Sequence, residues 1–90
     1  MKDNNDVVNI MDKLIGFVTG NPKREKILCA LDSKQAVSSS RVAKTAHIIE
    51  ASTEKILLEL VENGLAKSVE DAYSLTETGR EIKGRIEGFR

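Results

Sequence analysis

The sequence is short of several residue types on which particular kinds of protein depend. It has two phenylalanines, one tyrosine, one histidine, one proline, one cysteine and no tryptophan. Cys29 has no second cysteine to pair with, so we expect no internal disulfide and no cluster of soft metal ligands. The few aromatic rings leave little for stacking unpaired bases, which disfavours RNA as a ligand. No apolar run approaches the roughly 18 residues that suggest a membrane span.

An excess of charge of one sign is also lacking. The 90 residues include 14 Lys and Arg against 14 Asp and Glu, so the formal net charge is zero. Any attraction to nucleic acid must therefore come from a local patch and not from the whole molecule. The first residues, MKDNNDVVNIMD, are acidic and polar, unlike a signal peptide. With the single cysteine, these features predict a cytoplasmic protein.

Motifs that carry chemistry are missing as well. We recognise no paired carboxylates, nucleophile–base pair or phosphate-binding loop, and therefore expect neither an enzyme nor a cofactor or metal site. The run Ser38–Ser40 suits either a phosphate cradle or a set of helix caps; we favour caps, with Ser39 as the N-cap. Cys29 is expected to be buried and inert instead of reactive. His47 suits a phosphate contact, a pH sensor or a plain helix C-cap, and we favour the last.

The first part of the chain predicts two helices. One begins at the N-cap Asp6 and ends at Gly20; its apolar residues cover about half its circumference, which predicts packing against both its own domain and a partner subunit. The alternative is a helix wrapped by its own domain alone. These apolar residues are Val7, Val8, Ile10, Met11, Leu14, Ile15, Phe17 and Val18. The next helix starts at the cap Asn21 with Pro22 in its first turn. It points Ile27, Leu28 and Leu31 inward and Lys23, Arg24 and Lys26 outward, and Val37 follows as a short edge strand.

The stretch 41–64 contains two helices with a tight break at residues 46–48, which is the helix-turn-helix arrangement. The second helix, 49–63, is closed by Asn63-Gly64. Its apolar spacing predicts an inward face made of Thr53, Ile56, Leu57 and Leu60. The centre of the opposite face is predicted to carry Ala51, Lys55, Leu58 and Glu62, with Leu58 packing under the first helix or the hairpin.

The remaining chain predicts a hairpin and a last helix. The strands are Leu65–Lys67 and Tyr73–Leu75, with an acidic tip at Glu70 and Asp71. Thr76 is the expected N-cap of the last helix, and Gly79 allows a close approach at its start. Ile82, Ile86 and Phe89 form a narrow apolar stripe on that helix. Because so small a domain is marginally stable alone, we expect a homodimer joined by the first and last helices.

Three segments, VAKTAHI, STEKILLELVENGLAK and YSLTETGREI, resemble the winged helix-turn-helix transcriptional regulators of the MarR/ArsR-like superfamily, of the small prokaryotic or archaeal type. The resemblance covers about residues 22–82. It implies a mainly α fold with a small β-hairpin (α+β). The expected single domain, 1–90, comprises an N-terminal helix (1–20), a helix-turn-helix core and wing (21–76) and a C-terminal helix (77–90).

The resemblance also implies a set of DNA contacts. Ser52 and Lys55 correspond to positions that contact bases and phosphates. Further contacts are implied at the start of the preceding helix and at the base of the wing, and the basic residues of the second helix are expected to add more: Ser39, Arg41, Lys44, Lys67, Lys23, Arg24 and Lys26. The sequence departs from the family at His47, where Gly is usual, at Ile49, where Ser or Thr is usual, and in its acidic wing.

The leading hypothesis is a transcriptional regulator that inserts helix 49–63 into the major groove of double-stranded DNA. The alternative is a winged-helix module that binds another protein without strong DNA binding. The acidic wing, Glu50, Glu54 and the outward Leu58 favour that alternative. RNA binding is a third and weaker option.

Overall fold

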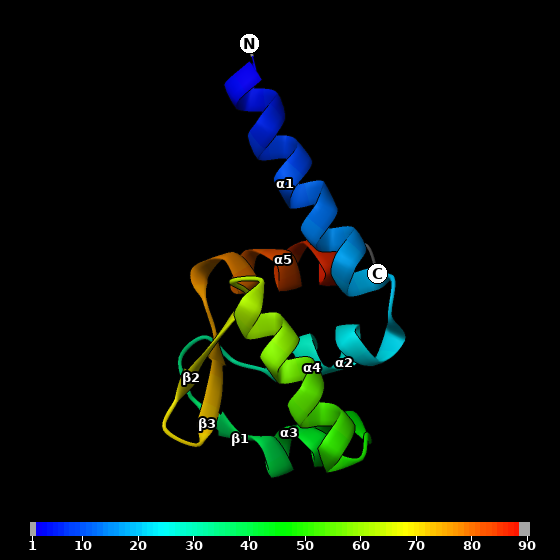
Figure 1. Ribbon diagram of the computed structural model, residues 1–90, viewed down its shortest axis with the longest axis vertical. Coiled ribbons are helices and arrows are strands. Elements are labelled where there is room, and N and C mark those ends of the chain that lie inside the picture. Colours follow the sequence, from blue (N-terminus) through cyan, green and yellow to red (C-terminus); the bar gives the residue numbers. More distant parts are fainter. Residues whose placement is uncertain (1, 89–90) are drawn as a thin grey trace.

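The computed structural model describes residues 2–88, with side chains described from Ile10 onward. It contains five helices and three short strands within that range (Figure 1). In chain order these are α1 (Lys2–Thr19), α2 (Pro22–Ala30), β1 (Val37–Ser38), α3 (Ser39–Ala46), α4 (Glu50–Glu62), β2 (Ala66–Val69), β3 (Ala72–Leu75) and α5 (Glu77–Gly88). The winged helix-turn-helix fold, mainly α with a small hairpin, is confirmed.

The sheet joins the hairpin to the segment that precedes the helix-turn-helix. Its order is β1-β3-β2 and both pairings are antiparallel. Val37 pairs with Tyr73, so the predicted edge strand at Val37 is confirmed. The hairpin strands are longer than predicted: pairing continues to Val69 and Ala72, which leaves a turn of only Glu70 and Asp71. Glu70 makes this tight turn by adopting a left-handed conformation, with φ 58°.

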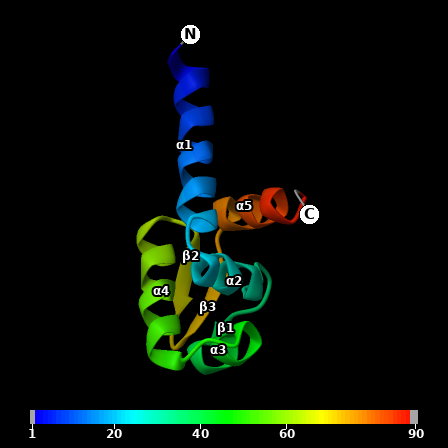
Figure 2. The ribbon, with the colours of Figure 1, turned by 90° about the vertical axis from the view of Figure 1, so that its right-hand side faces the viewer.

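Every helix contributes to one apolar core. α4 packs on α2, α3 and β2, while α1 packs on α2 and α5. Figure 2 shows α3 at one end of the molecule and α1 projecting at the other, with α5 extending sideways from the base of α1. The core consists of Val18, Ile27, Leu28, Leu31, Val42, Ala46, Ile56, Leu57, Leu60, Leu65, Ala66, Leu75, Ile82 and Ile86.

α1 begins earlier than predicted and extends beyond the rest of the molecule (Figure 1). Its first residue is Lys2, so Asp6 lies inside the helix and is not its N-cap. Val18 is fully buried, Leu14 is partly buried, and Ile10 is 57% exposed. The predicted core side chains Val7 and Val8 lie outside the described side chains. Only the C-terminal half of α1 is thus seen to pack on this domain. Within residues 2–88, no helix combines the length and apolarity needed to cross a membrane.

The helix caps largely follow the sequence. The side chain of Asn21 accepts hydrogen bonds from the backbone N–H groups of Lys23 and Arg24, with Pro22 in the first turn, as predicted. Thr76 Oγ1 accepts from Gly79 N at 3.0 Å and caps α5, also as predicted. The choice of Ser39 as the cap of α3 is wrong.

The cap of α3 is Ser38, whose hydroxyl accepts from Arg41 N at 3.3 Å. The physical reason is that Ser38 is still a strand residue, paired with Ala72, and carries the extended backbone that an N-cap needs (φ −66°, ψ 156°). Ser39 is therefore already inside the helix.

The corner between α4 and α5 is closed by very short contacts. Gly64, with φ 74°, ends α4, and its carbonyl accepts from Thr76 Oγ1 at 2.6 Å. Thr76 N donates to the Leu65 carbonyl at 3.1 Å, so two hydrogen bonds hold the start of α5 against this turn. A Cβ on Gly79 would collide with the carbonyl oxygen of Leu65 and lie 2.9 Å from its carbonyl carbon. The predicted close approach at Gly79 is confirmed, and it is an approach of backbone to backbone.

We expect Gly79→Ala to lower the free energy of unfolding by about 3 kcal/mol, because the Leu65 carbonyl cannot move aside as a flexible side chain would. Gly84→Ala, in the same helix, is the matched control: nothing lies within 4 Å of its added Cβ, so it should raise stability by about 0.5–1 kcal/mol. Urea unfolding followed by circular dichroism measures both. Equal effects of the two substitutions would contradict the close packing.

Candidate nucleic-acid interface

The helix-turn-helix is formed by α3, a three-residue turn and α4. His47 ends α3 in the left-handed conformation (φ 60°, ψ 44°), and its backbone N–H donates to the carbonyls of Ala43 and Lys44. Ile48 N also donates to the Ala43 carbonyl at 3.0 Å. His47 thus takes the conformation for which this position usually carries Gly, and the favoured C-cap assignment is confirmed.

The N-terminus of α4 lacks a side-chain cap. Ile49 occupies the N-cap position, makes no capping hydrogen bond and is 72% exposed. The first backbone N–H groups of α4 therefore stay available to an outside acceptor, and a helix N-terminus favours negatively charged groups. Glu50 in the first turn adds a negative charge at the same end.

The two faces of α4 are as predicted. Thr53, Ile56, Leu57 and Leu60 are buried, whereas Ala51, Lys55, Leu58 and Glu62 are exposed. Leu58 does not pack under α1 or the hairpin, because 56% of its surface is exposed. The α4 outer face (Ala51, Lys55, Leu58 and Glu62) is therefore open to a partner and mixes one cation, one anion and one large apolar side chain.

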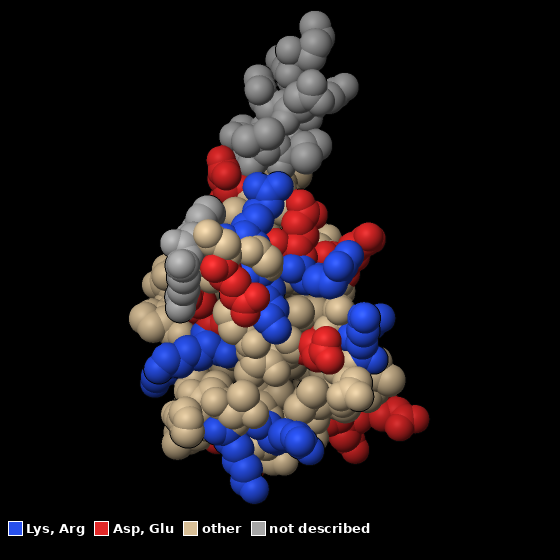
Figure 3. Space-filling view, turned by 180° about the vertical axis from the view of Figure 1, so that it is seen from behind, with Lys and Arg blue, Asp and Glu red and all other residues tan. Residues whose placement is uncertain are grey.

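The structure places most of the predicted contact residues on the surface, but in several separate places. Arg41 and Lys44 are exposed on α3, Lys55 on α4, Lys67 on β2 and Lys23 on α2, and Ser52 is partly exposed. Seen from behind, basic side chains gather over the end of the molecule where α3 lies (Figure 3).

Acidic groups divide this basic surface. Ser39 Oγ donates to Glu54 Oε2 at 3.3 Å, so Ser39 links α3 to α4 instead of being free. At the hairpin tip, Glu70 and Asp71 are exposed, beyond Lys67 on β2. Acidic side chains stand on the hairpin side of the molecule in Figure 3. A phosphate chain would be attracted along α3 and repelled at the wing tip.

Open hollows lie next to the helix-turn-helix. One, of about 500 Å³, lies between α3 and the start of α4 and includes Ser40, Lys44 and Glu50 in its walls. Another, of about 360 Å³, lies between α2 and α3 and includes Lys26 and Thr45. His47 contributes to both hollows, whose walls also contain apolar side chains such as Ile48 and Ile49 in the first and Ala30 in the second. Among the described side chains, no three His, Cys, Asp or Glu groups are placed to hold a metal ion.

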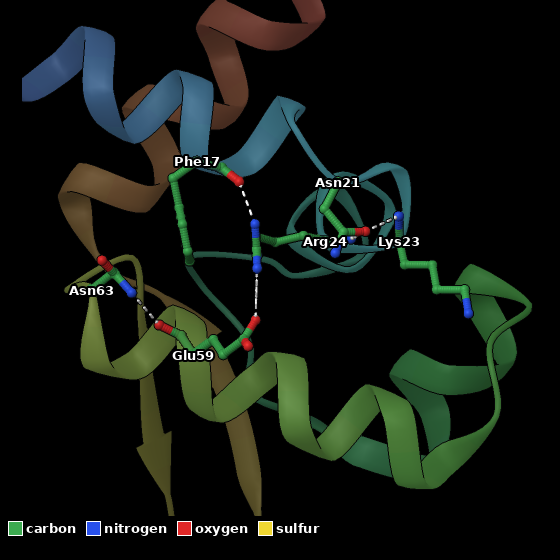
Figure 4. Close-up of polar contacts among 6 residues, drawn as sticks. All are labelled: Phe17, Asn21, Lys23, Arg24, Glu59 and Asn63. Carbon is green, nitrogen blue, oxygen red and sulfur yellow. Dashed lines mark hydrogen bonds and ion pairs between the residues drawn. The ribbon is translucent and has the colours of Figure 1, made fainter.

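Arg24 differs from its prediction as an outward-facing phosphate contact. Its side chain is 17% exposed and turns inward (Figure 4). Nη1 donates to the Phe17 carbonyl at 2.6 Å, Nη2 and Nε donate to Glu59 Oε1 at 3.1 and 3.3 Å, and the guanidinium lies 4.0 Å from the Phe17 ring centroid. Sequence reasoning missed this because Glu59 is 35 residues away and no local pattern signals the pair.

Cys29 lies at the edge of the core and is partly exposed, so the expectation of full burial is wrong. Burial nevertheless raises the pKa of the Cys29 thiol; Glu87 adds to the rise and Lys83 opposes it. A raised thiol pKa disfavours the reactive thiolate, in agreement with an inert residue.

The whole fold resembles solved structures of MarR proteins, although no family model and no curated sequence matches the chain. A MarR family transcriptional regulator from Silicibacter pomeroyi superposes with a TM-score of 0.71 at 15% identity, over 94% of this chain and 63% of that one. A MarR family protein of Mycobacterium tuberculosis gives 0.67 at 20% identity, over 97% and 67%. The multiple antibiotic-resistance repressor of Listeria monocytogenes gives 0.70 at 15% identity, over 97% and 63%.

At these identities the likeness concerns the fold, and the fold expected from the three sequence segments is thereby confirmed. The chain spans 63% to 67% of the length of these structures. About a third of each neighbour therefore has no counterpart in this chain.

We expect His47→Gly to raise the free energy of unfolding by about 0.5–1 kcal/mol, because Gly adopts the left-handed conformation without the strain of a Cβ. Ala51→Gly, at an exposed helical position of α4, is the control and should lower stability by about 0.5 kcal/mol. Urea unfolding compares the two. A loss of stability in both would show that the imidazole itself makes a needed contact.

Proposed function

We propose that this protein is a transcriptional regulator that binds double-stranded DNA, with the N-terminal half of α4 in the major groove. The observation that carries the proposal is the uncapped, exposed start of α4, with Ser52 and Lys55 behind it and Arg41 and Lys44 on the adjoining α3. A helix N-terminus with free N–H groups and nearby cations suits a phosphate backbone.

The proposed DNA contacts are selected by the exposure of their side chains to solvent. Arg41 and Lys44 are exposed on α3, Lys55 is exposed on α4, and Lys67 lies on β2 at the base of the wing. Lys23 and Lys26 on α2 are exposed and add further cations, and Ser52 adds a hydroxyl donor. The Ser39 hydroxyl already donates to Glu54, so it is left out of this set. Arg24 has no place in this set because its donors are directed at Phe17 and Glu59. With few cations and an acidic tip, affinity should be modest and should fall steeply with salt.

We expect Lys55→Gln to weaken binding to mixed-sequence duplex DNA and to reduce the slope of log affinity against log salt by about 1, because one phosphate contact is lost. Fluorescence anisotropy at several salt concentrations measures both quantities. The control is Arg85→Gln, which removes the same charge from α5, a helix that extends from the base of α1 and lies away from α3 (Figure 2). An unchanged slope for Lys55→Gln would place this side chain outside the interface.

Pairing with a second copy through α1 belongs to the same proposal. The apolar stripe of α5 is unavailable for a seam, because Ile82 and Ile86 are 0% and 2% exposed within the chain's own core. Phe89, the third residue of that stripe, lies outside the described residues. α1, in contrast, exposes Ile10 and projects away from the domain (Figure 1).

We therefore expect Ile10→Lys to shift the protein from dimer towards monomer in analytical ultracentrifugation, because a charge would be buried at the seam. Asp12→Asn, at an exposed position on the opposite side of α1 from Ile10, is the control and should leave the sedimentation coefficient unchanged. A wild-type protein that sediments as a monomer at all concentrations would remove the dimer from the proposal.

The second candidate function is a protein-binding winged helix, and one observation favours it. Leu58 is 56% exposed on the α4 outer face, beyond the N-terminal half that is proposed to enter the groove, and a large exposed apolar side chain there suits a protein partner. Absence of any salt-dependent DNA binding in the anisotropy experiment would favour this candidate.

A further inference from the structure

Arg24 joins three helices at one point (Figure 4). It belongs to α2, it donates to the carbonyl of Phe17 in the last turn of α1, and it makes an ion pair with Glu59 near the C-terminal end of α4. Glu59 is 34% exposed, so the pair is shielded from water mainly on the arginine side. Charge-assisted hydrogen bonds of this kind are stronger than neutral ones.

Through its contact with α1, Arg24 places a positive charge at the C-terminal end of that helix. The last carbonyls of a helix have no partner within the helix and carry partial negative charge. The last turn of α1 contains no basic residue of its own. Arg24 supplies the missing cation from the next helix, with its guanidinium over the Phe17 ring. The direction of α1 as it leaves the domain is therefore tied to the position of this guanidinium.

The contact with α4 lies one helical turn from the proposed DNA contact. Glu59 follows Lys55 by four residues, and both belong to one continuous helix of 13 residues. Asn63 lies four residues further along the chain, and its Nδ2 donates to the Glu59 carbonyl at 2.8 Å. Because a short helix moves as a rigid rod, a displacement at Glu59 also displaces Ser52 and Lys55.

We propose that Arg24 is a positioning residue that sets the orientation of α4 relative to α1, and that through it the α1 helix influences how α4 is presented to DNA. The inference rests on the proposed function, but the orientation of α4 relative to α1 can be measured without DNA. Arg24 itself touches no ligand in this proposal.

The direct test is the distance between spin labels on the two helices. Lys13→Cys on α1 and Glu62→Cys on α4, both exposed, carry the labels in a Cys29→Ser background. Labelled chains are mixed with an excess of unlabelled chain. Double electron–electron resonance then measures only the distance between two labels on the same chain. Arg24→Gln is compared with the labelled parent and with Arg24→Lys.

We expect Arg24→Gln to shift or broaden the distance distribution, because the Phe17 carbonyl and Glu59 lose their shared cation. Arg24→Lys keeps the charge but not the planar group of donors, so it should lie between Arg24→Gln and the parent. The matched control is Arg85→Gln, which removes the other described ion pair, an exposed one within α5 to Glu81. It should leave the distribution unchanged. If Arg24→Gln fails to fold, Glu59→Gln replaces it, since the amide keeps the shape and one acceptor. A distribution identical to the parent in the folded variant would overturn the inference.

DNA binding supplies the second readout. Arg24→Gln should weaken DNA binding by about two- to thirtyfold, the range of a typical coupling effect, without changing the salt slope, because no phosphate contact is lost. A reduced slope would make Arg24 a contact residue and overturn its positioning role.

The two proposals fail separately. If the wild-type protein binds no DNA but Arg24→Gln still alters the distance distribution, the proposed function falls and the positioning role stands. If the wild-type protein binds DNA and the distribution is unaltered, the positioning role falls and the function stands.

Discussion

The burial of one face of α4 is the constraint on which the rest of this small structure depends. Ile56, Leu57 and Leu60 supply the surface against which α2, α3 and β2 all pack. With 90 residues there is no second core, so these elements must share the same helix face. The opposite face of α4 takes no part in this packing. Its composition is therefore free to serve a ligand, and the same burial that stabilises the fold also holds that face outward.

The charges on the surface refine this picture. Arg41 and Lys44 are exposed on α3 and Lys55 on α4, although Glu50, Glu54 and Glu62 are exposed on α4 as well, and Glu70 and Asp71 occupy the hairpin tip. In a domain with zero net charge, such a separation produces a local field with one attractive and one repulsive end. A duplex that follows α3 would approach from one side, and the wing would act as a spacer more than as a clamp. The division also explains why total composition says little about the ligand of this protein.

The sequence predicted the elements well where the signal is local. The stripe on α4, the cap and proline at Asn21-Pro22 and the cap at Thr76 each depend on neighbouring residues, and each is confirmed. Three consecutive serines could not be separated by pattern, because the cap is chosen by the strand pairing of Ser38 with Ala72.

The candidate site was harder to predict than the fold. The exposed cations of α3 and α4 follow from the helical periodicity, but the fate of Arg24 does not. Position on a helix places Arg24 at the border of the buried face, and only the distant Glu59 and the end of α1 decide that it turns inward. The direction of a long side chain at such a border is a property of the tertiary structure.

The pairing of β1 with β3 determines whether the helix-turn-helix can be separated from the rest of the domain. β1 lies just before α3 and β3 is the second strand of the hairpin that follows α4, so the helix-turn-helix is enclosed between two segments that bond to each other. Leu75 N donates to the Asp32 carbonyl at 2.9 Å and closes the same loop of chain from the other side. The helix-turn-helix is thus not a portable peptide. Residues 39–62 excised alone would lose the sheet that holds them, so surface residues of this motif would have to be exchanged on an intact winged helix.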